Sequence, residues 1–60
     1  MSGWAGMTLD EKANVDAFAA EWLKSQGYKP APFQKAMALQ RLRRGETAAE
    51  IVAALVAMRI

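Results

Sequence analysis

The chain has 60 residues and a formal net charge of +2, and it contains neither cysteine nor histidine. This length allows one small domain, and the missing thiols and imidazoles exclude disulfides, Cys or His metal sites, and Ser-His or Cys-His relays. A hydrophobic content of 53% is too high for a disordered chain.

The composition favours helices over sheet. Alanine, the strongest helix former, is frequent, while valine and isoleucine are few. No uncharged stretch approaches the roughly 20 residues that span a bilayer, and no basic segment of a signal peptide opens the chain. We therefore expect an all-α protein of the cytoplasm that has no membrane segment.

The first expected helix covers residues 9–26. Residues 1–7, with two glycines and Trp4, are expected to form a flexible arm ahead of a single domain at residues 8–60. Thr8 and Glu11 have the spacing of a capping box, and Gly27 suits the left-handed stop. The helix has an apolar stripe with helical spacing, made of Val15, Phe18, Ala19 and Trp22.

The second expected helix covers residues 32–44, after a proline-rich connector. Pro32 fits the first helical position, and Gly45 supplies the stop. Phe33 and Met37 lie on one side of this helix, and Ala38, Leu39 and Leu42 lie on the other. Because apolar residues lie on two sides of this helix, we expect it to be the central helix, packed between the other two. We also expect Phe33 to lie in the core with Phe18 and Trp22.

The third expected helix covers residues 48–59 and follows a second capping box, Thr47 with Glu50. Its core stripe is expected to be Ile51, Leu55 and Met58. A second ridge lies beside this stripe and is made of Val52, Val56 and Ile60. Because a three-helix chain cannot bury a helix that is apolar nearly all round, we expect a homodimer with two-fold symmetry through this helix.

Catalysis and cofactors are not expected. The acidic residues near helix starts suit caps, the four glycines form no phosphate loop, and no acidic cluster has calcium-loop spacing. The sequence therefore predicts a protein that is not an enzyme and holds no metal or cofactor.

A basic half suggests a rival class of function. Residues 28–60 carry an excess of cations, and a basic patch is predicted at Lys35, Arg41, Arg43 and Arg44. Residues 39–52 resemble the start of a helix-turn-helix, but the early positions of the third helix are mostly alanine rather than base-reading side chains. Weak nucleic-acid binding by a small regulator is the alternative interpretation.

The favoured interpretation is a compact three-helix protein that binds another protein, as an accessory subunit, a regulator, or an inhibitor of the kind carried by phages and plasmids. The partner surface is predicted on the outer ridge of the third helix, at Val52, Val56, Arg59 and Ile60. Its valines and isoleucine would form the apolar centre, and arginines would form the rim.

Overall fold

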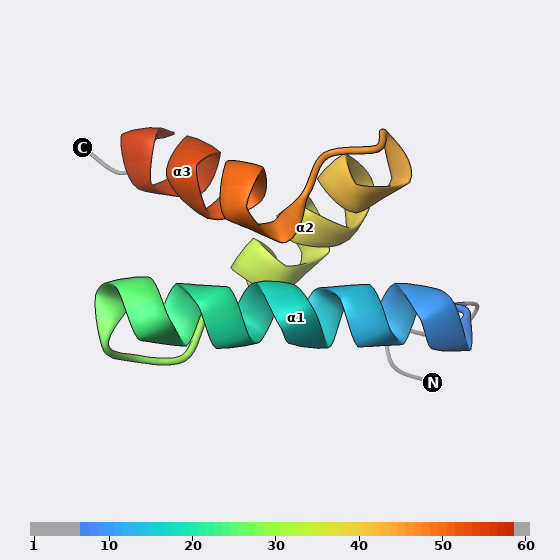
Figure 1. Ribbon diagram of the computed structural model, residues 1–60, viewed down its shortest axis with the longest axis horizontal. Helices are drawn as coiled ribbons and strands as arrows, with labels where there is room; N and C mark the ends of the chain where they lie inside the picture. The colour runs from blue at the N-terminus through green and yellow to red at the C-terminus, as the bar shows by residue number, and fades with distance from the viewer. Residues whose placement is uncertain (1–6, 59–60) are drawn as a thin grey trace.

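The computed structural model describes residues 7–58, which form three α-helices and no strand (Figure 1). They are α1 (Leu9–Gln26), α2 (Pro32–Arg43) and α3 (Ala48–Met58). The all-α, three-helix prediction is confirmed, with α2 ending one residue earlier than expected. The predicted arm lies outside the described residues except for Met7.

Local chemistry fixes where the helices begin and end. Glu11 donates its amide to Thr8 Oγ1 at 3.0 Å, and Thr8 donates its amide to Glu11 Oε1 at 3.0 Å, which completes the capping box. Thr47 and Glu50 make the same pair of bonds ahead of α3. Gly27 and Gly45 have φ angles of 83° and 95°, a backbone region that glycine adopts without steric cost.

Helix α2 begins differently, because Ala31 has no side chain that can cap it. Pro32 occupies the first turn, where a missing amide costs nothing. The side chain of Gln34 reaches back, and its Oε1 accepts the Ala31 amide at 2.8 Å. The extended connector is therefore joined to the helix by a glutamine, without any acidic residue in the first turn.

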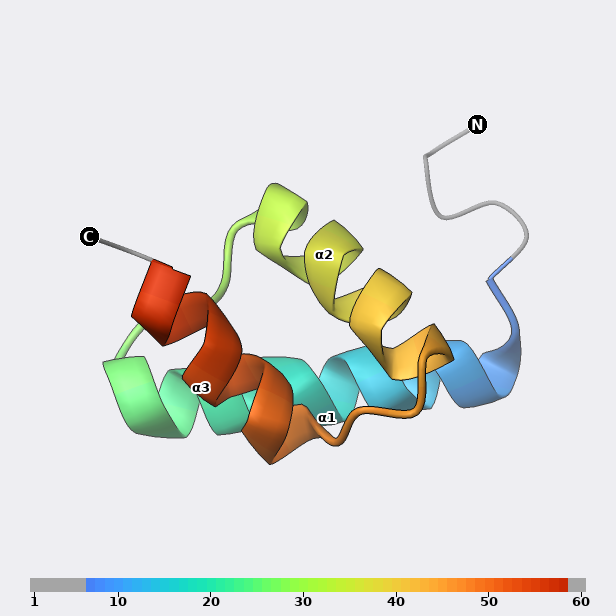
Figure 2. The same cartoon turned by 90° about the horizontal axis from the view of Figure 1, so that it is seen from above.

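Helices α2 and α3 lie on the same side of α1 (Figure 1) and run in opposite directions across it when seen from above (Figure 2). Helix α1 contacts both of the others more extensively than they contact each other. The prediction that the second helix is central is therefore wrong. The central helix is α1, the longest of the three, because it supplies the bulkiest core side chains.

The core is centred on aromatic residues of α1. Trp22, Phe18 and Ile51 are the largest side chains with no exposed surface. The rings of Phe18 and Trp22 are tilted with centroids 6.0 Å apart, and Tyr28 packs edge-on against Trp22 at the same separation. Around them lies one connected cluster from all three helices, which consists of Phe18, Trp22, Ala38, Ile51, Val52 and Leu55.

Helix α3 is rotated from the orientation that the sequence suggested. Val52 is only 7% exposed and belongs to the core, whereas Met58, expected in the core, is 49% exposed. Ile51 and Val52 are neighbours in sequence and lie about 100° apart around the helix, so one broad buried face covers both. Ile51 and Leu55 of the first predicted stripe and Val52 of the second therefore belong to a single buried face.

Helix α2 has one covered side and one open side. Ala38 and Leu39 are buried, and Leu42 packs against the core. Phe33 is 64% exposed, so its predicted place in the core is wrong. The reason is that the core cluster lies on the Ala38 side, whereas Phe33 borders an open groove toward α3.

Because Trp22 is fully buried in the core, we expect its replacement by alanine to reduce the stability of the fold strongly. We expect Trp22→Ala to lower the free energy of unfolding by about 3–5 kcal/mol, which is most of what a small domain possesses. The matched control is Leu23→Ala, a change at a neighbouring side chain that is 44% exposed. Thermal melts followed by circular dichroism should show a lost cooperative transition for Trp22→Ala alone. A normal melt of that variant would contradict the aromatic core.

Candidate functional site

An apolar groove lies between α2 and α3. Its volume is about 290 Å³, and its lining comes from these two helices alone: Phe33, Gln34, Met37, Leu55 and Met58. Leu55 is buried and contacts the core cluster on its other side, so it forms the floor of the groove. The groove therefore opens away from the core.

The walls of the groove are large apolar side chains in contact with solvent. Phe33, Met58 and Met37 are 64%, 49% and 37% exposed. Full burial of such a side chain is worth about 1.5–3 kcal/mol, so leaving three of them together in water gives up substantial stabilisation. Methionine is flexible and polarisable and adapts to varied apolar surfaces. This arrangement is typical of a surface that another molecule covers.

The groove has little polar chemistry. None of its five lining residues is ionisable, and the only polar one, Gln34, already uses its Oε1 in the bond to Ala31. Over residues 7–58 no three His, Cys, Asp or Glu side chains group closely enough to hold a metal ion. None of the helices described is both long and apolar enough to cross a membrane.

The predicted partner ridge on the third helix is not an open surface. Val52 is buried, and Val56 is partly buried and packs against the core cluster. Arg59 and Ile60 lie outside the described residues. The prediction that Val52 belongs to an exposed interface is therefore wrong, because α3 turns this side toward α1 and α2.

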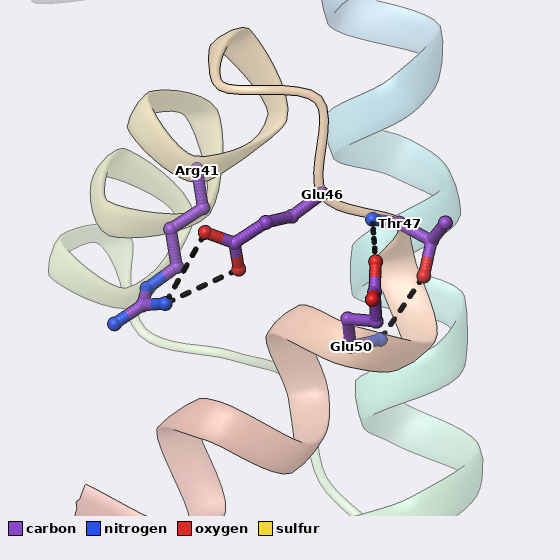
Figure 3. Close-up of polar contacts among 4 residues, drawn as sticks. All are labelled: Arg41, Glu46, Thr47 and Glu50. Carbon is purple, nitrogen blue, oxygen red and sulfur yellow. Dashed lines mark hydrogen bonds and ion pairs between the residues drawn. The ribbon is translucent and has the colours of Figure 1, made fainter.

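The four residues of the predicted basic patch are not gathered on one surface. Arg41 pairs with Glu46 at 3.2 Å, across the turn between α2 and α3 (Figure 3). Arg43 pairs with Glu11 of α1 at 2.6 Å. Lys35 is half-buried and faces α1 beside Val15. Arg44 is exposed, and its side chain forms no hydrogen bond or ion pair with any residue in 7–58.

Glu11 joins the start of α1 to the end of α2. Its two carboxylate oxygens accept from Arg43 Nε at 2.6 Å and Nη2 at 3.2 Å, while one of them also accepts the Thr8 amide. The bond from Arg43, followed by the bond from the Thr8 backbone, lowers the pKa of Glu11 from 4.5 to about 2. The same ion pair raises the pKa of Arg43. At α3, the amide of Thr47 lowers the pKa of Glu50.

Part of the groove is visible in the sequence of α2. The separation of Phe33 and Met37 from Ala38 and Leu39 on α2 was visible in the spacing. What the spacing could not show is that α3 would place Leu55 and Met58 beside the open side of α2. That placement depends on how the two helices are rotated against α1.

Comparisons with known proteins found no match to this chain among protein-family models, curated proteins or solved structures. The groove and the charges around it are therefore the features of this chain that bear on its function.

The ion pair between Glu11 and Arg43 predicts a pH dependence. Because folding lowers the pKa of Glu11, its contribution to stability is present above pH 4.5 and is lost as the pH falls toward 2. We expect Glu11→Gln to lower the melting temperature near neutral pH, and the difference from the unmodified protein should shrink over that window. Glu21→Gln, which removes an exposed pair with Lys24, is the control. A difference that stays constant down to pH 2 would show that the charge of Glu11 is not involved.

Proposed function

We propose that this chain acts by binding another protein through the groove between α2 and α3. The observation that carries the proposal is the set of three exposed apolar side chains, Phe33, Met37 and Met58, around one opening with a buried floor. A soluble chain rarely leaves a contiguous apolar surface open unless that surface has a partner. In this proposal the protein is an accessory subunit, regulator or inhibitor in the cytoplasm, and not an enzyme.

A small-molecule ligand has less support than a protein. Pockets for small molecules combine apolar walls with a few convergent polar groups that orient the ligand. The groove offers only Gln34, whose Oε1 is engaged. Without an ionisable group in its lining, the groove also has no general acid or base. A partner's apolar side chains need neither.

A nucleic-acid interface also has less support. Affinity for DNA comes largely from cations that neutralise phosphates, and two of the four predicted basic residues, Arg41 and Arg43, have acidic partners within the chain. The early part of α3 presents Ala49, Glu50 and Ala53 to solvent, and the alanines have no group that can form a hydrogen bond with a base edge. We therefore place nucleic-acid binding second.

Self-association is the other protein contact that the sequence predicts. The predicted homodimer depended on an open ridge at Val52 and Val56, and the burial of Val52 removes that reason. A second copy remains one of the proteins that the groove can be tested against.

Photocrosslinking from the groove tests the proposal. With benzoylphenylalanine in place of Phe33, we expect an adduct with a protein in an extract of the native host cells, with or without nuclease. The added change Met37→Glu should reduce the yield about 10-fold or more, because it puts a charge where an apolar contact is needed.

The controls separate the groove from other exposed apolar positions. Benzoylphenylalanine in place of Leu23, which is 44% exposed on α1, should give no such adduct, and Leu23→Glu should not affect crosslinking from position 33. Circular dichroism checks that each variant is folded. Equal yields from positions 23 and 33, or adducts that disappear with nuclease, would refute the proposal.

A further inference from the structure

The open side of α2 continues from the groove into a cationic segment. Phe33, Met37 and Arg41 follow one another at intervals of four residues on α2, so they share one side of the helix. Arg44 comes three residues later as the C-cap residue, and its helical backbone angles continue the row. At a rise of 1.5 Å per residue, this row spans roughly 16 Å. The apolar opening therefore has two arginines at one end, near the turn between α2 and α3.

The charges around this row are mostly positive. Helix α2 contains no acidic residue, and α3 contains only Glu50, whose carboxylate accepts the Thr47 amide. Glu46 offsets Arg41, but no side chain in residues 7–58 offsets Arg44. Arg43 is paired with Glu11 and Lys35 faces α1, so neither adds free charge to this row. Arg44 therefore leaves the row with one positive charge that is not neutralised, which favours a negatively charged occupant.

The same charge argues against a symmetric second copy. A two-fold contact brings a surface against its own copy in the reverse direction, so a dimer centred on the groove would place Arg44 opposite the apolar end of the copy's row, where no carboxylate lines the groove. An acidic partner can instead pair a carboxylate with Arg44.

The shape of the groove indicates a helix as the occupant. Helices α2 and α3 both lie above α1 (Figure 1) and run in opposite directions when seen from above (Figure 2). The groove between them is lined by residues one helical turn apart, such as Phe33 with Met37. A further helix laid in such a groove buries residues at intervals of three and four. It would complete a four-helix arrangement with α1 on the opposite side.

We infer that the groove receives an acidic amphipathic helix of a partner protein, with its apolar stripe on Phe33, Met37 and Met58 and its carboxylates beside Arg44. This inference rests on the proposed function and specifies the partner's chemistry. About three turns of helix match the row from Phe33 to Arg44. Arg41 lies along the same row, where an incoming carboxylate can share it with Glu46.

Designed peptides test the inference with the full chain. One probe is a helical peptide of about 14 residues with leucines at intervals of three and four and glutamates at its ends; a second has lysines in place of the glutamates. We expect the acidic peptide to bind at least about 10-fold more tightly, with affinity that weakens as salt is added. Isotope-labelled methionine methyl groups report the place of binding, since Met37 and Met58 line the groove and Met7 does not.

Charge reversal provides the decisive comparison. Arg44→Glu should cancel or invert the preference for the acidic peptide. Lys24→Glu makes the same change in net charge at an exposed side chain of α1. It should leave the preference within about twofold, because α1 contributes no residue to the lining of the groove and an exposed charge is screened by salt. Loss of the preference in both variants would show an effect of net charge alone, which would overturn the role of Arg44.

The remaining outcomes separate this inference from the proposed function. Equal binding of both peptides in the groove would overturn the acidic partner while supporting a protein-binding groove. Shifts of Met37 and Met58 that depend on the concentration of the chain alone would identify a second copy as the occupant and overturn the inference. If neither peptide binds but photocrosslinking from position 33 succeeds, the acidic-helix inference is refuted and the proposed function is supported. If photocrosslinking from position 33 also fails, the inference and the proposed function are both refuted.

Discussion

The packing of two aromatic rings on α1 is the contact on which the rest of the structure depends. Phe18 and Trp22 are fully buried, and they meet Ala38 of α2 and Ile51 of α3 in one cluster. Helices α2 and α3 have 12 and 11 residues, lengths at which an isolated helix is marginal in water. Their order therefore comes from docking on α1, assisted by the caps at their ends.

This dependence on α1 also produces the groove. Each of the two short helices packs one apolar side against Phe18 and Trp22. A domain of about 60 residues has too little chain to bury the remaining apolar sides of these helices as well. The part of α2 that carries Phe33 and Met37 is left open, and α3 adds Met58 beside it. The open apolar surface is thus a consequence of burying Trp22 and Phe18 with only three helices in the described chain.

The features that sequence alone could predict are those decided by neighbours along the chain. The boxes at Thr8 and Thr47 and the stop at Gly27 depend on residues within one turn, so spacing identifies them. The burial of Val52 and the exposure of Phe33 depend on how one helix is rotated against another, which spacing does not contain. The ion pair between Glu11 and Arg43 joins residues 32 positions apart, so the sequence showed Glu11 only as a cap.

The ion pair between Glu11 and Arg43 changes the interpretation of the chain's positive charge. By composition the second half carries an arginine cluster, which favours nucleic acid. In the fold, Arg43 holds α2 to α1 and Arg41 holds the turn before α3, so both are used within the molecule. Of the three clustered arginines, Arg44 is the one without an acidic partner in residues 7–58, and it lies at the end of an apolar row. A single arginine there can pair with one carboxylate of an apolar helix, whereas a phosphate backbone is bound by several cations.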